Sequence, residues 1–291
     1  MKYLSFPYIS FPLAVACLVA GAVSLAAPRA AHAQNGLWIS SCNYSHSRND
    51  DPIVFPAMVG ASHLHDFVGS RTTDAFSTAA SLQAGSTTCA MPDNASAYWV
   101  PATYEAGVQL TPSATHRNAL FYYSRGGGLD NNVTVQPMPS GLKMLLGNMH
   151  ATSPAENPAI GRGDIFWRCG THGSHLTAPP SSCPGETTMV LFFQFPQCWD
   201  GVHLDSPDHL SHMADPHGGV CPASHPVPLP RITAYWRYNV GSSIGTITYS
   251  SGAYYTAHMD VFSAWDQAAM QALVTRCINT NVNCGVDPAI P

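Results

Sequence analysis

The sequence predicts a mainly β protein: a single β-sandwich or jelly-roll-like domain with long disulfide-stapled loops and one short C-terminal helix. Two observations predict this class. Short runs rich in aromatic and β-branched residues recur along the chain and are bounded by Gly, Pro, Asn or Ser, which is typical of strands. An even number of cysteines follows residue 33, which indicates disulfides in an exported chain.

The N-terminal segment, residues 1–33, is expected to be a removable signal peptide. Lys2 precedes an uncharged apolar run over residues 13–27, and Ala-His-Ala at 31–33 supplies an A-x-A cleavage site before Gln34. The run is shorter than the roughly 20 residues that a membrane-spanning helix needs, although a membrane anchor and lipid attachment at Cys17 are the alternatives. We therefore expect a secreted or periplasmic protein, not attached to a membrane after cleavage, with residues 34–291 forming one domain.

Ten strands are expected in the mature chain. They cover residues 36–40, 53–58, 98–104, 119–124, 133–137, 143–146, 165–168, 188–195, 231–238 and 246–250. The run 189–195 is apolar almost throughout, so this strand is expected at the centre of a sheet.

One helix is expected near the C-terminus. Residues 263–266 (Ser-Ala-Trp-Asp) form a capping-box pattern, and Ala269, Leu273 and Cys277 follow at helical spacing. The helix is expected to pack its apolar side against the sheet. For Trp265 a packing role is favoured over a role as a platform for a ligand.

The mature chain keeps eight cysteines, for which 105 disulfide connectivities are possible. Closure of short loops favours sequence neighbours. That rule gives Cys42–Cys89, Cys169–Cys183, Cys198–Cys221 and Cys277–Cys284. A thiolate metal site is the competing interpretation, and the absence of any C-x-x-C weakens it.

Net charge disfavours nucleic acid as a partner. Without Lys2 and Arg29 the mature chain has 12 − 2 = 10 basic residues against 17 acidic ones, a formal charge of −7. A polyanion would be repelled by this surplus.

The first candidate site is the segment 62–66, Ser-His-Leu-His-Asp. In an extended chain the period-two alternation places His63 and His65 on one face, where two imidazoles can share a metal ion. Asp66 would point away or orient a ring through its second nitrogen. The alternative is a pair of ordinary polar histidines.

Two further clusters follow. Between Cys198 and His225 the chain carries Asp200, Asp205 and His212, in a long loop that a disulfide would pin. The competing interpretation is a turn-rich surface loop whose carboxylates bond backbone amides. The third cluster is His258 with Asp260, for which structural and functional roles are both open.

These segments together resemble a known family. The motifs are Ser-His-Leu-His-Asp-Phe-Val-Gly at 62–69, Thr-Cys at 88–89, Ala-Tyr-Trp-Val-Pro at 97–101, Cys-Trp-Asp-Gly at 198–201, Leu-Asp at 204–205, Ser-His-Met at 211–213, Cys-Pro-Ala-Ser-His-Pro at 221–226, His-Met-Asp-Val-Phe at 258–262 and Trp-Asp at 265–266. In this order they are similar to the secreted domain-of-unknown-function family numbered nineteen ninety-six, found in fungi and bacteria and sometimes joined to WSC carbohydrate-binding modules.

The resemblance implies an extracellular role, and the WSC modules of some members suggest polysaccharide or cell-wall material as the partner. It also implies which residues recur at motif positions: His63, His65, Asp66, Asp200, Asp205, His212, His225, His258 and Asp260.

Three functions are compatible with these residues. The first is a secreted enzyme acting on carbohydrate, with His63, His65, His212 and His225 as metal ligands and Asp66, Asp200, Asp205, His212, His258 and Asp260 as catalytic candidates. Its metal would be one divalent ion: zinc or copper for imidazole ligands, and iron or manganese where an Asp joins them.

The second function is that of a non-catalytic carbohydrate- or cell-surface-binding module with Tyr98, Trp99, Tyr122, Tyr123 and Trp199 stacking on sugar rings. The third is a polar network that only orders the scaffold.

Overall fold

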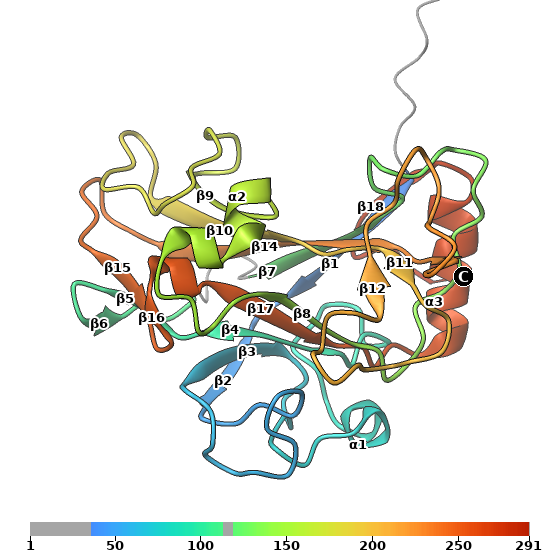
Figure 1. Ribbon diagram of the computed structural model, residues 1–291, viewed down its shortest axis with the longest axis horizontal. Coiled ribbons are helices and arrows are strands. Elements are labelled where there is room, and N and C mark those ends of the chain that lie inside the picture. Colours follow the sequence, from blue (N-terminus) through green and yellow to red (C-terminus); the bar gives the residue numbers. More distant parts are fainter. Residues whose placement is uncertain (1–35, 113–118, 291) are drawn as a thin grey trace, which may run out of the picture. The chain divides into compact units, whose positions relative to one another are not determined.

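Two large β-sheets form the body of the protein (Figure 1). The six-stranded sheet has the order β18 (Asn283–Val286), β1 (Leu37–Cys42), β7 (Ala119–Ser124), β14 (Arg231–Asn239), β10 (Thr188–Gln194) and β9 (Ile165–Cys169). The five-stranded sheet has the order β2 (Tyr44–Arg48), β3 (His65–Gly69), β4 (Ala97–Pro101), β17 (His258–Phe262) and β8 (Lys143–Gly147). Neighbours are antiparallel except β1 and β18. The mainly β class expected from the sequence is confirmed.

The computed structural model describes residues 36–112 and 119–290. These belong to one compact unit, Gln34–Pro291. The expected signal segment and its cleavage site lie outside the described residues. Within the described part, every helix is too short or too polar to cross a membrane.

Short elements complete the chain. Two small sheets are formed by β12 (Met213–Ala214), β11 (Cys198–Trp199) and β13 (Val227–Pro228), and by β16 (Gly252–Ala253), β15 (Ile247–Tyr249), β5 (Thr103–Glu105) and β6 (Val108–Gln109). The helices are α1 (Ala79–Ala84), α2 (Pro158–Arg162) and α3 (Gln267–Leu273), with single helical turns at Pro154–Glu156 and Tyr254–Thr256 and a π-helical turn at Val274–Ile278.

Strand alternation divides the side chains of the five-stranded sheet between two cores. Tyr98 and Val100 of β4 join the main core, where the Tyr98 ring stacks on Phe121 of β7 at 3.7 Å between centroids. Phe67 of β3 and Trp99 of β4 point to the opposite face and form a second, smaller core with residues of the 50s loop and α1. The five-stranded sheet is therefore covered on both faces, which explains why β3, β4 and β17 are buried along their whole length.

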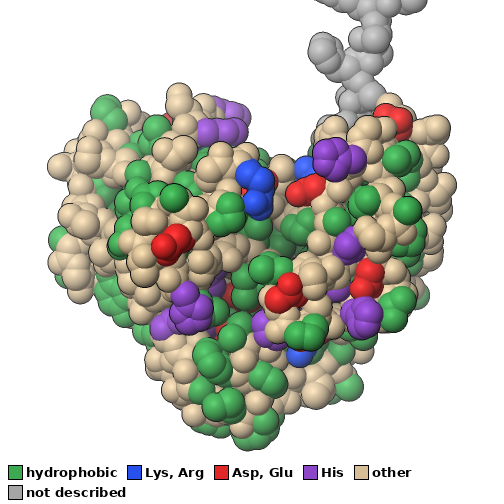
Figure 2. Space-filling model, in the orientation of Figure 1, with side chains coloured by type: hydrophobic (Ala, Val, Ile, Leu, Met, Phe, Trp, Pro, Cys, Tyr) green, Lys and Arg blue, Asp and Glu red, His purple; other side chains and the backbone are tan. Residues whose placement is uncertain are grey.

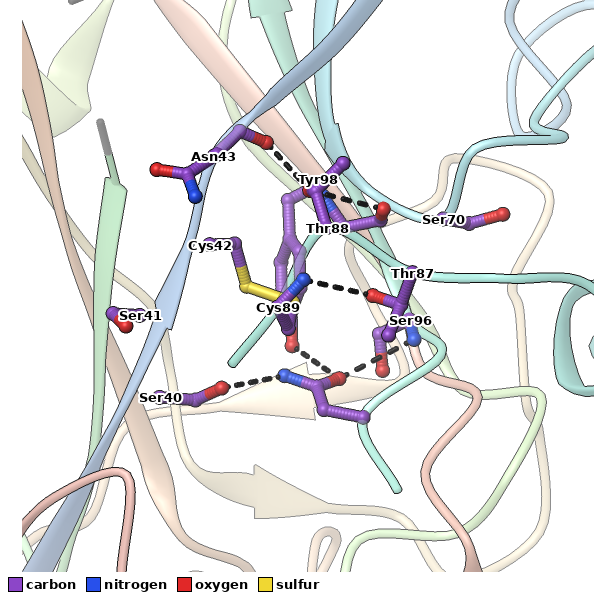
Figure 3. The surroundings of a disulfide bond; sticks show 12 residues. Ser40, Ser41, Cys42, Asn43, Ser70, Thr87, Thr88, Cys89, Ser96 and Tyr98 are labelled. Atoms are coloured by element: carbon purple, nitrogen blue, oxygen red, sulfur yellow. Dashed lines mark hydrogen bonds between the residues drawn. A yellow bond between two sulfur atoms is a disulfide. The ribbon is translucent and has the colours of Figure 1, made fainter. Parts of the chain in front are cut away.

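Four disulfides staple the loops, and all four pairs expected from loop closure are confirmed. Figure 3 shows the Cys42–Cys89 bridge between the end of β1 and the segment that precedes β4. Around it, Thr88 donates to the carbonyl of Asn43, and Asn94 connects Ser40 to the Tyr98 hydroxyl. Disulfides of this number indicate an oxidising, non-cytoplasmic environment.

The strand expected at residues 53–58 is wrong. The Asp51 carboxylate accepts hydrogen bonds from the amides of Ile53 and Val54, which turns the chain there. The strand expected at 133–137 is also wrong, because the Asn279 side chain bonds both the N–H and the C=O of Val135 in place of a strand neighbour.

The short C-terminal helix expected from the sequence is confirmed, although it begins later than predicted. It begins after Asp266, whose carboxylate accepts from the Ala269 amide as the N-cap, so the predicted Ser263 capping box is wrong. Residues 258–262 just before it form β17, which the sequence did not predict as a strand. Trp265 is fully buried against Trp38 and Tyr123, as the packing interpretation held.

Candidate metal centre

Three histidines converge on the face of the five-stranded sheet that carries the smaller core. His65 begins β3, and His63 lies two residues earlier on the same side, with 4.3 Å between the ring centroids. The alternation expected for the His-Leu-His segment explains this placement.

His258 enters the cluster through strand register. Asp260 of β17 pairs with Trp99 of β4, and antiparallel pairing therefore puts His258 opposite Pro101. Pro101 also pairs with His65 of β3. The two imidazoles thus flank one small proline ring and meet above it, although two strand spacings separate their backbones.

The three Nε2 atoms face one another. His63 Nε2 lies 3.1 Å from His258 Nε2, and His65 Nε2 lies 3.4 Å from His258 Nε2. Zinc–nitrogen bonds of 2.0–2.1 Å at a tetrahedral angle give an N–N separation of about 3.3 Å. These two separations match the spacing that one tetrahedral ion requires, and ligand nitrogens of all three histidines lie within 4.8 Å of one another.

Backbone carbonyls fix the tautomers of two of the rings. The Nδ1 of His65 lies 3.2 Å from the carbonyl of Asp50, and the Nδ1 of His258 lies 2.8 Å from the carbonyl of Thr256. A carbonyl oxygen only accepts, so each Nδ1 carries the proton and each neutral ring turns an Nε2 lone pair to the centre. Facing lone pairs repel unless a cation lies between them.

Burial keeps these rings neutral. It lowers the pKa of His63 to about 4 and that of His258 to about 3, and it holds the pKa of His65 well below its usual value. His63 also lowers the pKa of His65 and His258, and His258 lowers that of His65. His150, an exposed histidine in the turn after β8, lowers the pKa of His63 and His258. Neutral imidazole is the form that binds metal ions.

Two buried carboxylates adjoin the histidines. Ligand atoms of Asp51, His65 and Asp260 lie within 4.8 Å of one another. Both oxygens of Asp260 and one of Asp51 are buried without a hydrogen-bond partner among the described residues. Burial raises the pKa of both carboxyls, that of Asp260 strongly and with a contribution from Asp51. A cation bound at the centre would compensate the negative charge that the two carboxylates carry when they are ionised.

A comparison with known family models identifies the family of the chain. The family model described as Domain of unknown function (DUF1996) matches residues 51–265. The chain belongs to this family. No curated protein and no solved structure matches the chain significantly. The matched segment of this DUF1996 chain contains all five residues of the cluster.

Two predicted metal ligands of the DUF1996 chain lie outside the cluster. His212 is buried, and its ring nitrogens bond Ser206 Oγ and the Lys143 carbonyl. Lys143 pairs with Phe262, four residues or roughly 13 Å along β17 from His258. His225 bonds the Ser211 carbonyl and Ser224 Oγ. The structure thus brings His258 to His63 and His65, in place of the expected His212 and His225.

The predicted carboxylates of the DUF1996 chain are dispersed. Asp66 points to the opposite face of β3, where Ser47 and Gln109 bond it and burial raises its pKa to about 6. Asp200 accepts from the His203 ring. Asp205 accepts from His209 and pairs with Lys143. Of the predicted catalytic set, only His258 and Asp260 lie in the cluster.

Sequence reasoning missed Asp51 and His150. No motif surrounds either residue. Asp51 adjoins His65 and Asp260 through the fold, and His150 acts on the pKa of His63 and His258. Of the aromatic residues proposed as sugar platforms, Tyr98, Trp99 and Tyr123 are buried in the cores of the DUF1996 chain. Tyr122 and Trp199 are partly exposed.

A groove of about 470 Å³ runs along β8 beside the centre. Its lining includes Gly147, which pairs with His258, and Leu145, which pairs with Asp260. Figure 2 shows the surface hollowed on this side, with hydrophobic side chains at the bottom and charged side chains on the walls. His209 also lines the groove and lies near enough to Asp51 to lower its pKa.

Proposed function

We propose that the protein is a secreted, metal-dependent enzyme whose centre is formed by His63, His65 and His258. The observation that carries this proposal is the convergence of His63 Nε2 and His65 Nε2 on His258 Nε2, each at tetrahedral ligand spacing from it, with the tautomers of His65 and His258 fixed by backbone carbonyls. In a scaffold network the Nε2 lone pairs of His65 and His258 would each face a hydrogen-bond donor and not each other.

Zinc fits this donor set best. Three neutral imidazoles with a fourth position left to water are the arrangement of catalytic zinc sites. A bound zinc ion would supply a water molecule that ionises near neutral pH. Copper would use the same imidazoles, whereas iron or manganese would favour a set that includes Asp260.

The protein's own residues perform three tasks in this proposal. His65 and His258, fully buried, set the position of the ion, because β3, β4 and β17 fix their backbones. His63 is only half-buried and forms the side of the centre from which metal and substrate enter. Asp51 and Asp260 adjoin His65, and a bound cation would favour their ionised form, whose charge offsets that of the ion.

We infer that the substrate is extracellular polysaccharide or cell-wall material. The support is the resemblance to a family of secreted proteins, some of which are joined to WSC modules. The reaction proposed is hydrolysis, since a zinc site offers no redox chemistry.

The test is turnover by the zinc-loaded mature chain purified without a histidine tag. p-Nitrophenyl acetate reports water activation, and a panel of plant and fungal wall polysaccharides reports the natural reaction. His63→Ala is expected to lower turnover by at least about 100-fold. Mutation of a residue that only supports a metal ligand typically lowers affinity or activity 10–100-fold, and loss of a ligand itself should have at least as large an effect. His203→Ala, an exposed histidine in another loop, is the matched control. Equal turnover in the wild type and His63→Ala would refute the enzyme.

A further inference from the structure

The groove along β8 is bordered by the open edge of a sheet. β8 is the last strand of the five-stranded sheet, and among the described strands it pairs only with β17. In Figure 1, α2 and the β11–β12 hairpin lie to either side of the space in front of β8. The groove is lined by residues 144–147 of this strand.

Hydrogen bonds at the start of β8 show which residues direct their backbone outward. The Ser263 amide bonds the Leu142 carbonyl, so even-numbered residues face β17. The Lys143 amide instead bonds the Leu204 carbonyl, and the Lys143 carbonyl accepts from His212. Odd-numbered residues therefore face away from the sheet, and the 204–212 loop closes the edge at Lys143.

The next odd-numbered residues, Leu145 and Gly147, are left open. The N–H and C=O of Leu145 and the N–H of Gly147 point into the groove, and no other described residue bonds them there. Both residues are partly exposed. Such groups form a template for a further strand, and natural proteins usually cover or shorten an edge of this kind.

We propose that the groove binds an extended peptide segment, which adds to β8 as a sixth antiparallel strand. A peptide backbone offers N–H and C=O groups at the period of the β8 edge, which a sugar chain does not. This inference does not depend on the metal centre.

The walls define the chemistry of the peptide. Met213 and Pro196 give one wall apolar surface. The charges of the lining residues are compensated, because Arg162 pairs with Asp164 and Asp215 pairs with Arg231, which lies outside the lining. The favoured peptide is uncharged in its central part and has an apolar residue at every second position, because alternate side chains of a strand face the same wall.

The probe is a random peptide library displayed on phage and selected on the full mature chain. One selected peptide is synthesised, and its dissociation constant is measured by calorimetry. Single N-methylations are then placed along it. Methylation at alternate residues is expected to weaken binding by about fivefold or more, the value of one lost hydrogen bond, with little effect at the residues between. An effect without this period, or a library that yields no binder, overturns the proposal.

Hydrogen exchange locates the peptide. The amides of Leu145 and Gly147 are expected to exchange more slowly when the selected peptide is bound, while the Leu146 amide, already bonded to β17, stays unchanged. Leu145→Pro should weaken binding by about fivefold or more, since proline removes a single outward donor and is tolerated at an edge. Slow exchange at Leu145 and Gly147 in the free protein would show that another part of the chain or a second copy already occupies the edge, and would overturn the proposal.

Discussion

His63 Nε2 and His258 Nε2 lie 3.1 Å apart although 195 residues separate them along the chain. This contact joins a loop residue before β3 to the first residue of β17, with His65 as the third partner at 3.4 Å from His258. The centre therefore forms only when the central strands of the five-stranded sheet are in register.

Gly147→Ala is expected to destabilise the protein and weaken metal binding. Gly147 has a φ of +105°, and a Cβ there would lie 2.8 Å from the Cα of His258 and closer still to the Ala257 carbonyl. Strain of this kind costs about 1–3 kcal/mol. Calorimetric melting measures it. The control is Gly161→Ala in α2, where a Cβ meets nothing within 4 Å and the change should be neutral or stabilising. Equal melting temperatures for the two variants would contradict the role given to Gly147.

His212→Ala is expected to lower stability without loss of metal. The change leaves the Lys143 carbonyl and Ser206 without their partner in a buried site, which costs about 1–3 kcal/mol. Urea unfolding measures this difference, and elemental analysis follows the metal. Loss of metal at unchanged stability would restore the original expectation that His212 is a ligand.

Removal of the Cys198–Cys221 bridge, by changing both residues to Ser, should cost about 3 kcal/mol for a cross-link that spans 23 residues. Metal content is expected to stay at the wild-type value, because none of the three clustered histidines lies between these cysteines. Thermal unfolding and elemental analysis of the same sample test both statements. A metal-free double variant that remains folded would place a ligand in this loop.

The loop between these cysteines should lose stability in acid. Burial opposes ionisation of Asp200, but hydrogen bonds from the His203 ring and the amides of Val202 and His203 together outweigh it and lower its pKa to about 2. A pKa lowered by folding contributes stability above the unfolded value of 3.8, and this contribution is lost as the pH falls toward 2. Melting temperatures between these pH values should fall more steeply for the wild type than for Asp200→Asn. Parallel slopes would exclude this contribution.

Much of the scaffold could be predicted from local sequence. β7 was predicted to the residue and β10 to within one, because β-branched and aromatic runs bounded by turn residues report strands directly. The disulfide pairs followed from loop length. Residues 53–58 were misassigned because a single carboxylate, Asp51, decides their conformation through two backbone amides.

The site was predicted only in part. The alternation of His63 and His65 is a local property, so their shared face was foreseen. The third histidine depends on the register of β17 with β4, which no local pattern encodes. His212 and His225 appeared equally suitable by sequence, but their ring nitrogens are used to hold the 198–225 segment against β8 and itself.

Elemental analysis of the tag-free mature protein tests the metal centre most directly, with His258→Ala and His212→Ala measured beside the wild type. We predict one equivalent of metal, zinc by preference, in the wild type and in His212→Ala, and none in His258→Ala. A wild-type protein that binds no stoichiometric metal after incubation with zinc, or a His258→Ala variant that retains it, would contradict the centre.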